Sequence, residues 1–187
     1  MKKMTLVRDT IIFTTIVVIL ALLLSFVKII TQNRINEIKT IELNNAYRQV
    51  CDGYDSSIDA TDKIINRLIV SRAELINCKI VYDKSKNICG YIVMNKISGY
   101  GGKIVTLIGF DSEGNITGIA YPEGLQETPG IGKRIEEDDF KNRFIGKNKQ
   151  DINDVDTLTG ATISSSAVKE SAILESDCVS KLINSGE

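Results

Sequence analysis

Residues 103 to 121 read KIVTLIGFDSEGNITGIAY and contain two apolar runs separated by a polar turn. The runs, Lys103–Phe110 and Ile116–Tyr121, are rich in β-branched residues, and the segment between them, Asp111–Asn115, contains aspartate, glycine and asparagine. Strand-forming residues around a short turn of this composition are typical of a β-hairpin. We therefore expect two antiparallel strands here.

A second hairpin is predicted immediately upstream. The apolar runs Ile76–Tyr82 and Ile88–Ile97 flank the polar turn Asp83–Asn87. The glycine-rich segment Gly99–Gly102 then leads to the strand that begins at Lys103. The central part of the chain is therefore expected to consist of two consecutive antiparallel hairpins.

Helices are predicted after the hairpins. Ser164–Asn184 has an approximate apolar stripe at helical spacing, formed by Val168, Ile173, Leu174, Val179, Leu182 and Ile183. Before it we expect a loop over Pro122–Lys133, a short helix over Ile135–Phe144 and a charged connector over Lys147–Asp154. Hairpins with helices at their ends predict an α+β fold class.

The N-terminal segment is long and apolar enough to span a membrane. No charged residue occurs from Thr10 to Val27, and with Ile29 and Ile30 the stretch reaches the roughly 20 residues that a spanning helix needs. We expect one transmembrane helix over residues 10–30. A cleaved signal peptide would have a shorter apolar region ending in small residues. A buried core helix is disfavoured because the segment is apolar all round. Basic residues flank the span on both sides, so charge leaves its orientation open.

Composition excludes several kinds of chemistry. The chain of 187 residues contains no His and no Trp and has a net charge of −1. The lack of His excludes Ser-His-Asp and Cys-His nucleophiles and disfavours zinc sites. The balanced charge gives no indication of nucleic-acid binding. A chain with so few catalytic groups is expected to obtain its chemistry from a cofactor. We predict neither catalytic residues nor a metal site.

The four cysteines, Cys51, Cys78, Cys89 and Cys178, lie far apart and form no Cys-x-x-Cys motif. Iron–sulfur and thioredoxin-like sites are therefore disfavoured. Disulfides would be possible outside the cytoplasm, but we interpret these residues as small buried apolar side chains.

The glycine-rich segments do not match nucleotide-binding loops. Around Gly130–Lys133, Glu127 stands where a Walker A loop has its first glycine, and Arg134 stands where that loop has a hydroxyl. A dinucleotide fingerprint would need a glycine in place of Ile135. Gly99–Lys103 fails both patterns, so these glycines are interpreted as turn residues.

The segment Asp156–Thr162 reads DTLTGAT and has the form Asp-x-x-[Ser/Thr]-Gly-Ala-Thr. Gly160 and Ala161 put no bulk beside the Thr162 hydroxyl. The serines at 164–166 are helix-start signals. A phosphate on Thr162 would therefore lie near a helix N-terminus, where free N–H groups and the dipole favour an anion. An ordinary Thr-Gly turn with a serine N-cap is the alternative interpretation.

Three parts of the chain together resemble the FMN-binding domain family. The first comprises Ser98–Ile104, Gly109–Asp111 and Gly114–Gly118, the second is the Glu-Thr-Pro-Gly-x-Gly loop Glu127–Gly132, and the third is Asp156–Thr162. The third is similar to the acceptor sequence on which a flavin transferase esterifies FMN. The resemblance covers about residues 90–175.

The resemblance implies the site residues. Thr162 would carry FMN through a phosphoester bond, and Asp156 would serve recognition by the flavin transferase. Further cofactor-binding residues are expected in two segments: Glu127, Thr128, Gly130, Ile131, Leu158, Thr159, Gly160, Ala161 and Ser164. For the first segment, an ordinary β-turn around Pro129 is the alternative.

The apolar N-terminal segment and the family resemblance together predict that the chain is divided into four parts. These are an N-terminal tail at 1–9, the transmembrane helix at 10–30, a membrane-proximal helix and linker at 31–55, and an FMN-binding domain at 56–187, in which antiparallel hairpins are flanked by helices. Within the third part, Asn33–Val50 has helical apolar spacing, and the polar segment 52–57 ends the helix.

Within the family, the chain looks most like the G subunits of Rnf-type ion-translocating ferredoxin:NAD oxidoreductases. This implies an electron-relay subunit without independent substrate turnover, anchored in the cell membrane by a single pass with its FMN domain on the extracytoplasmic side. The implied partners are the other membrane and peripheral subunits of an Rnf-type complex and a flavin transferase. The alternatives are the C subunit of a sodium-pumping NADH:quinone reductase, another envelope flavin carrier, or a membrane-tethered scaffold without flavin.

Overall fold

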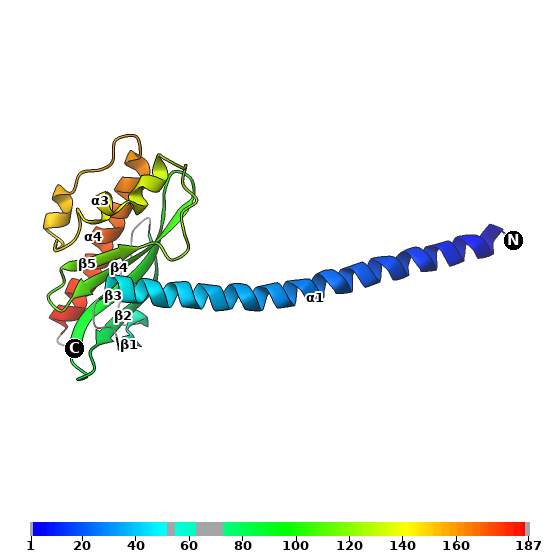
Figure 1. The fold of residues 1–187 in the computed structure, drawn as a ribbon, viewed down its shortest axis with the longest axis horizontal. Helices are drawn as coiled ribbons and strands as arrows, with labels where there is room; N and C mark the ends of the chain where they lie inside the picture. Colours follow the sequence, from blue (N-terminus) through cyan, green and yellow to red (C-terminus); the bar gives the residue numbers. More distant parts are fainter. Residues whose placement is uncertain (1, 52–54, 63–72, 186–187) are drawn as a thin grey trace. The chain divides into compact units, whose positions relative to one another are not determined.

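The computed structural model describes residues 2–51, 55–62 and 73–185. The chain divides into two compact units, of which the first ends at Ile41 and the second begins at Glu42. Helix α1 (Lys2–Val50) contributes to both units, whereas the strands and the other described helices lie in the second (Figure 1). The domain boundaries drawn from the sequence stay predictions.

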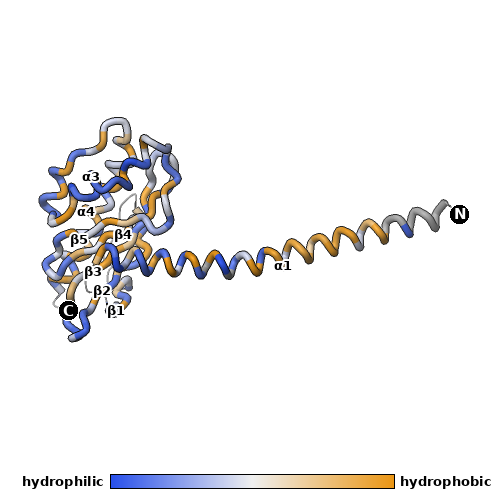
Figure 2. The backbone as a smooth tube through the Cα atoms, in the orientation of Figure 1, coloured by the Kyte–Doolittle hydropathy of each residue, from blue (hydrophilic) through white to orange (hydrophobic). Residues whose placement is uncertain are grey.

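The first unit is the N-terminal part of α1. Its side chains from Ile11 to Ile30 are exposed, and the helix is long and apolar enough to cross a membrane. Figure 2 shows how the continuous apolar stretch gives way to a mixed segment further along α1. The predicted apolar helix is confirmed, and the helix predicted for Asn33–Val50 is its direct continuation. Because α1 begins at Lys2, the residues before the apolar stretch are helical too.

The second unit is built on a five-stranded antiparallel sheet whose strands follow one another in sequence order. The strands are β1 (Ser56–Asp59), β2 (Glu74–Tyr82), β3 (Ile88–Ser98), β4 (Lys103–Asp111) and β5 (Ile116–Ala120). The two predicted hairpins are confirmed as β2–β3 and β4–β5. Strands β3 and β4 also pair with each other in the middle of the sheet, and the loop that connects them lies at the end of these two strands.

Strand β1 is the main feature of the sheet that the sequence analysis missed. We expected only a break over residues 52–57, of which 52–54 lie outside the described residues, but the chain pairs with β2 from Ser56 onward. The strand is short, and three of its four residues are exposed. It therefore lacks the apolar alternation by which a strand is recognised.

Both faces of the sheet are covered within the second unit. Helix α4 (Thr162–Asn184) packs on one face, and the last turns of α1 pack on the other (Figure 1). Along β4, Ile104 and Ile108 belong to the α4 side, whereas Val105 and Leu107 belong to the α1 side. Because successive side chains of a strand point to opposite faces, a strand covered on both sides reads as a nearly continuous apolar run.

The connection from β5 to α4 contains three short helical segments: η1 (Gly132–Glu136), α3 (Asp138–Lys141) and η2 (Asp151–Asp154). The sequence predicted one short helix over Ile135–Phe144. This prediction is wrong, because Glu137 is extended, with ψ of 140°, and divides the segment into η1 and α3. The predicted C-terminal helix is confirmed as α4.

The four cysteines are free thiols. Cys51, Cys78 and Cys178 are buried and Cys89 is partly buried, which is the expected behaviour of small apolar side chains. Burial raises the pKa of the Cys178 thiol to about 12, so this group stays protonated at neutral pH.

Candidate functional site

The acceptor segment folds into a turn directly before α4. The Ala161 N–H donates to the Leu158 carbonyl at 3.0 Å. Gly160 has φ of +83°, a conformation that residues with a side chain rarely adopt. Leu158 is buried in the core and fixes the start of the turn. Thr162 is the first residue of α4 and is exposed, so its hydroxyl can be reached from outside the protein.

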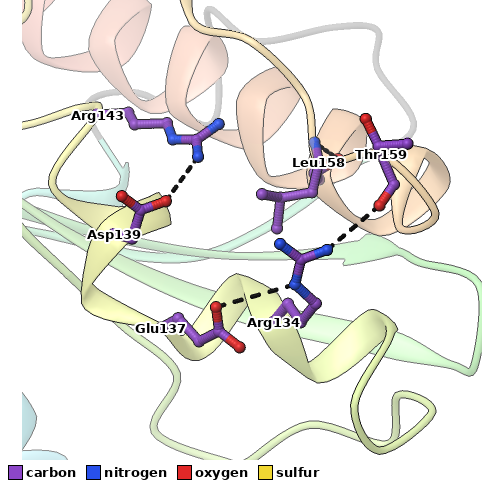
Figure 3. A network of polar contacts seen from close by, with 7 residues as sticks. Arg134, Glu137, Asp139, Arg143, Leu158 and Thr159 are labelled. Atoms are coloured by element: carbon purple, nitrogen blue, oxygen red, sulfur yellow. Dashed lines mark hydrogen bonds and ion pairs between the residues drawn. The ribbon is translucent and has the colours of Figure 1, made fainter.

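Two side chains outside the turn hold it in place. The buried Ser165 hydroxyl accepts from the Leu158 N–H at 3.0 Å and donates to the Ala161 carbonyl at 2.9 Å. From η1, the Arg134 guanidinium donates to the Thr159 carbonyl at 3.3 Å (Figure 3). The backbone before Thr162 is therefore tied both to α4 and to the segment that follows β5.

The N-terminus of α4 offers N–H groups to an anion. Ala161 occupies the N-cap position, and among the described residues no side-chain hydrogen bond caps the helix. The first N–H groups of an α-helix have no partner within the helix, and together with the helix dipole they attract negative charge. The alternative interpretation, a turn with a serine N-cap, does not agree with this geometry, because Ser165 bonds to the Leu158 N–H and to the Ala161 carbonyl. A phosphate on Thr162 would meet these N–H groups.

A pocket of about 510 Å³ opens beside this helix end. Its volume is within the range of about 300–1,000 Å³ that is typical of sites for small molecules and cofactors. Three segments that are distant in sequence form it, namely the β3–β4 loop, the loop after β5, and the start of α4 with the preceding turn. The lining residues are Tyr100, Glu127, Thr128, Ile131, Gly132, Gly160, Ala161, Thr162, Ile163 and Ser164.

Most of the residues predicted to bind the cofactor meet at this pocket. Thr162 lies in its lining, together with Glu127, Thr128, Ile131, Gly160, Ala161 and Ser164. Gly130, Leu158 and Thr159 do not line it: Leu158 belongs to the core, and the Thr159 carbonyl faces Arg134. Asp156 is exposed and lies outside the pocket lining. Its role in transferase recognition, and the contacts of the other residues with a cofactor, stay predictions.

Three lining residues, Tyr100, Gly132 and Ile163, were not predicted. Tyr100 comes to the pocket because β3 and β4 pair along their length and their loop reaches the start of α4, where the Tyr100 N–H donates to the Ser164 hydroxyl at 3.3 Å. The motif Ser98–Ile104 was the available signal, since it was part of the family resemblance without being assigned to the site. Ile163 directly follows the acceptor threonine and is 57% exposed. The spacing of apolar residues in the sequence did not indicate that this side chain is exposed.

The chemistry of the lining suits a cofactor that carries both a phosphate and an apolar ring. The exposed Thr162 hydroxyl and the uncapped helix end suit a phosphate. Tyr100, Ile131 and Ile163 are large apolar side chains that are more than half exposed, and a planar ring could cover them. Among the residues that the structure describes, no group of three or more His, Cys, Asp or Glu side chains could hold a metal ion.

Comparison with known proteins defines the class of this domain. Residues 99–173 match the family model of the FMN-binding domain. This stretch runs from the β3–β4 loop into α4 and includes every segment that lines the pocket. The similarity to the FMN-binding domain family is therefore carried by the same segments that form the pocket.

The relatives found among curated proteins are G subunits of ion-translocating oxidoreductase complexes. The chain is 30% identical over 94 residues to the G subunit of the proton-translocating ferredoxin:NAD(+) oxidoreductase complex of Clostridium ljungdahlii, covering 46% of this chain and 50% of the relative. It is 35% identical over 105 residues to the G subunit of the ion-translocating oxidoreductase complex of Methanosarcina acetivorans, covering 52% and 55%. It is 30% identical over 138 residues to the corresponding G subunit of Salmonella typhi, covering 67% of this chain and 61% of the relative. The aligned region thus spans little more than half the length of these relatives.

Proposed function

We propose that this chain is a membrane-anchored flavoprotein subunit that relays electrons within an Rnf-type ion-translocating oxidoreductase complex. Its FMN would be bound covalently, through a phosphoester to Thr162. The observation that carries the proposal is the position of Thr162, an exposed hydroxyl at the uncapped N-terminus of α4 and in the lining of the pocket. Similarity to G subunits supports the assignment to an Rnf-type complex.

Residues of this chain would hold the FMN in two ways. The phosphate would be esterified at the Thr162 oxygen and surrounded by the N–H groups of the first turn of α4. The ring would be held within the pocket that contains Thr128 and Ile131. Bound FMN supplies a group that accepts electrons and passes them on, while the protein positions it and sets its surroundings. The described residues therefore act by binding and orientation.

Helix α1 would anchor this domain to the membrane. The helix has the length and composition of a membrane span, and its apolar side chains from Ile11 to Ile30 are exposed. We propose that the FMN domain lies on the extracytoplasmic side, because a covalent bond retains the cofactor where lost FMN could not easily be replaced. The other subunits of the complex and a flavin transferase are the proposed partners.

Mass spectrometry of the intact chain tests the proposal. The full-length protein is co-expressed with a flavin transferase, purified in detergent and digested for peptide mapping. We expect the mass of FMN less one water on the peptide that contains Thr162, since the ester forms with loss of one water overall. Thr162→Ala should abolish the addition. Thr157→Ala is the matched control, because this threonine belongs to the same segment and does not line the pocket.

Two results would contradict the proposal. Unmodified protein, obtained with a transferase that modifies a control substrate, would favour a scaffold without flavin. Modification that persists in Thr162→Ala would assign the flavin to a different residue. Once attachment at Thr162 is established, co-purification of the tagged protein with the other subunits from its native membrane would test the assignment to an Rnf-type complex.

A further inference from the structure

Glu127 is a carboxylate buried between two loops of the pocket. Its side chain is only 4% exposed, although it belongs to the loop that follows β5. Both carboxylate oxygens lie 3.2 Å from the Gly101 nitrogen, whose N–H donates to them. Gly101 belongs to the β3–β4 loop, so this side chain connects two loops that are distant in the sequence.

Glycines leave the space that this carboxylate fills. A Cβ atom at Gly99 would lie 2.3 Å from Oε1 of Glu127, and a Cβ atom at Gly132 would lie 2.5 Å from Oε2. Gly101 itself approaches the backbone of the other loop, where an added Cβ would lie 2.3 Å from the Gln126 carbonyl oxygen. The carboxylate is thus enclosed by both loops at positions where no side chain fits.

This arrangement gives Glu127 a role in building the pocket. An ionised or polar group that is withdrawn from water needs hydrogen-bond partners, and a carboxylate binds backbone N–H groups strongly. The partner of Glu127 lies on the opposite loop, so the two loops must stay together for the carboxylate to remain satisfied. Both loops contribute to the pocket lining, one through Tyr100 and the other through Thr128 and Ile131.

We propose that Glu127 is a positioning residue that joins the β3–β4 loop to the loop after β5 and so forms the pocket before any cofactor is bound. The inference deepens the proposed function, on which it rests for the identity of the cofactor. It assigns Glu127 to the assembly of the site, whereas sequence reasoning placed this residue among those that contact the flavin.

Hydrogen–deuterium exchange on flavin-free protein tests the inference. The full chain with Thr162→Ala, purified in detergent, is compared with the same chain carrying Glu127→Ala, Glu127→Gln or Glu123→Ala in addition. We expect Glu127→Ala to accelerate exchange in residues 99–103 about tenfold or more, because the bond that holds the Gly101 N–H is lost. Glu127→Gln should restore most of the protection, since its amide oxygen has the same reach. Glu123 is exposed on the same loop, and its replacement should leave exchange unchanged.

A second variant covers the case in which Glu127→Ala does not fold. The methyl group of Gly132→Ala would push against the carboxylate, so this variant should accelerate exchange in residues 99–103. Gly102→Ala is its control and should not accelerate exchange there, because its methyl group meets chiefly the exposed and movable Gln126 side chain. Unchanged exchange in Glu127→Ala, or in Gly132→Ala where only that variant folds, would overturn the inference. Failure of Glu127→Gln to restore protection would overturn it as well. Since no flavin is involved, these results do not depend on whether Thr162 is the attachment site.

Discussion

The Thr106 hydroxyl lies 2.8 Å from Oε1 of Glu175 in the interface between β4 and α4. Both residues are fully buried, and Ser171 and Asn95 complete a buried polar cluster. Burial raises the pKa of the Glu175 carboxyl well above its usual value near 4.5, and the hydroxyls of Thr106 and Ser171 oppose this shift without cancelling it. A protonated carboxyl is the form that this interface favours.

The raised pKa of Glu175 predicts that the folded domain loses stability as pH rises. In the unfolded chain this carboxyl ionises near pH 4.5, whereas in the folded chain it keeps its proton to higher pH. Between the two pKa values the folded state holds more protons, so its stability falls by up to about 1.4 kcal/mol per pH unit from this group. Glu175→Gln cannot ionise, so the stability difference between this variant and the wild type should grow in favour of the variant as the pH rises above about 4.5. Thermal unfolding of both proteins in detergent measures this, and a difference independent of pH would contradict it.

The glycines under the end of α1 give a prediction about stability. A Cβ atom at Gly118 would lie 2.7 Å from Cα of Val50, and one at Gly109 would lie 2.0 Å from the Val50 carbonyl oxygen. Either Gly→Ala change should displace the last turn of α1 from the sheet and destabilise the second unit by about 1–3 kcal/mol. Gly102→Ala is the control, since its added Cβ meets a movable side chain. Denaturant unfolding in detergent measures the effect, and equal stability of all three variants would show that α1 can shift without cost.

Local patterns were enough to predict much of this fold. The four strands of the two hairpins and helix α4 follow from runs of apolar residues bounded by turn residues. Thr162 and Ser164 could be placed at a helix start because the signals for that start lie within a few residues. The features that depend on distant segments could not be predicted this way. Tyr100 reaches the pocket through strand pairing, and β1 is recognisable only through its partner β2.

The buried face of α4 shows a further limit of pattern reading. The predicted stripe contained Ile173 and Leu174, which are only partly buried, whereas Ser171 and Glu175 are fully buried. Apolar periodicity locates a helix correctly, but it cannot show that polar side chains take core positions when a neighbouring strand supplies their hydrogen-bond partners. Thr106, Asn95 and Glu175 form such a set, and their positions in the sequence are far apart.

The conformation of Gly160 gives a prediction about flavin attachment. Gly160 has φ of +83°, so Gly160→Ala should strain the acceptor turn by about 1–2 kcal/mol and displace Thr162. We expect attachment of FMN to slow about tenfold or more, since small displacements of a reacting group are costly. Gly146→Ala is a matched control, because Gly146 also has positive φ, at +74°, equally open surroundings and a position outside the pocket lining. The two variants should lose similar stability, and equal rates of attachment would contradict the prediction.

The contact between Arg134 and the acceptor turn predicts a smaller effect of the same kind. Arg134→Gln removes the guanidinium that donates to the Thr159 carbonyl at 3.3 Å. This bond is exposed, so its loss should be worth no more than about 1 kcal/mol and slow FMN attachment by roughly threefold to fivefold. Arg143→Gln is the control, because Arg143 pairs with Asp139 at 2.6 Å and has no bond to the turn among the described contacts (Figure 3). Initial rates of mass addition, measured with limiting transferase, separate the variants. If Arg143→Gln slowed attachment as much as Arg134→Gln did, the effect would come from surface charge that the transferase senses, and the bond to Thr159 would have no specific role.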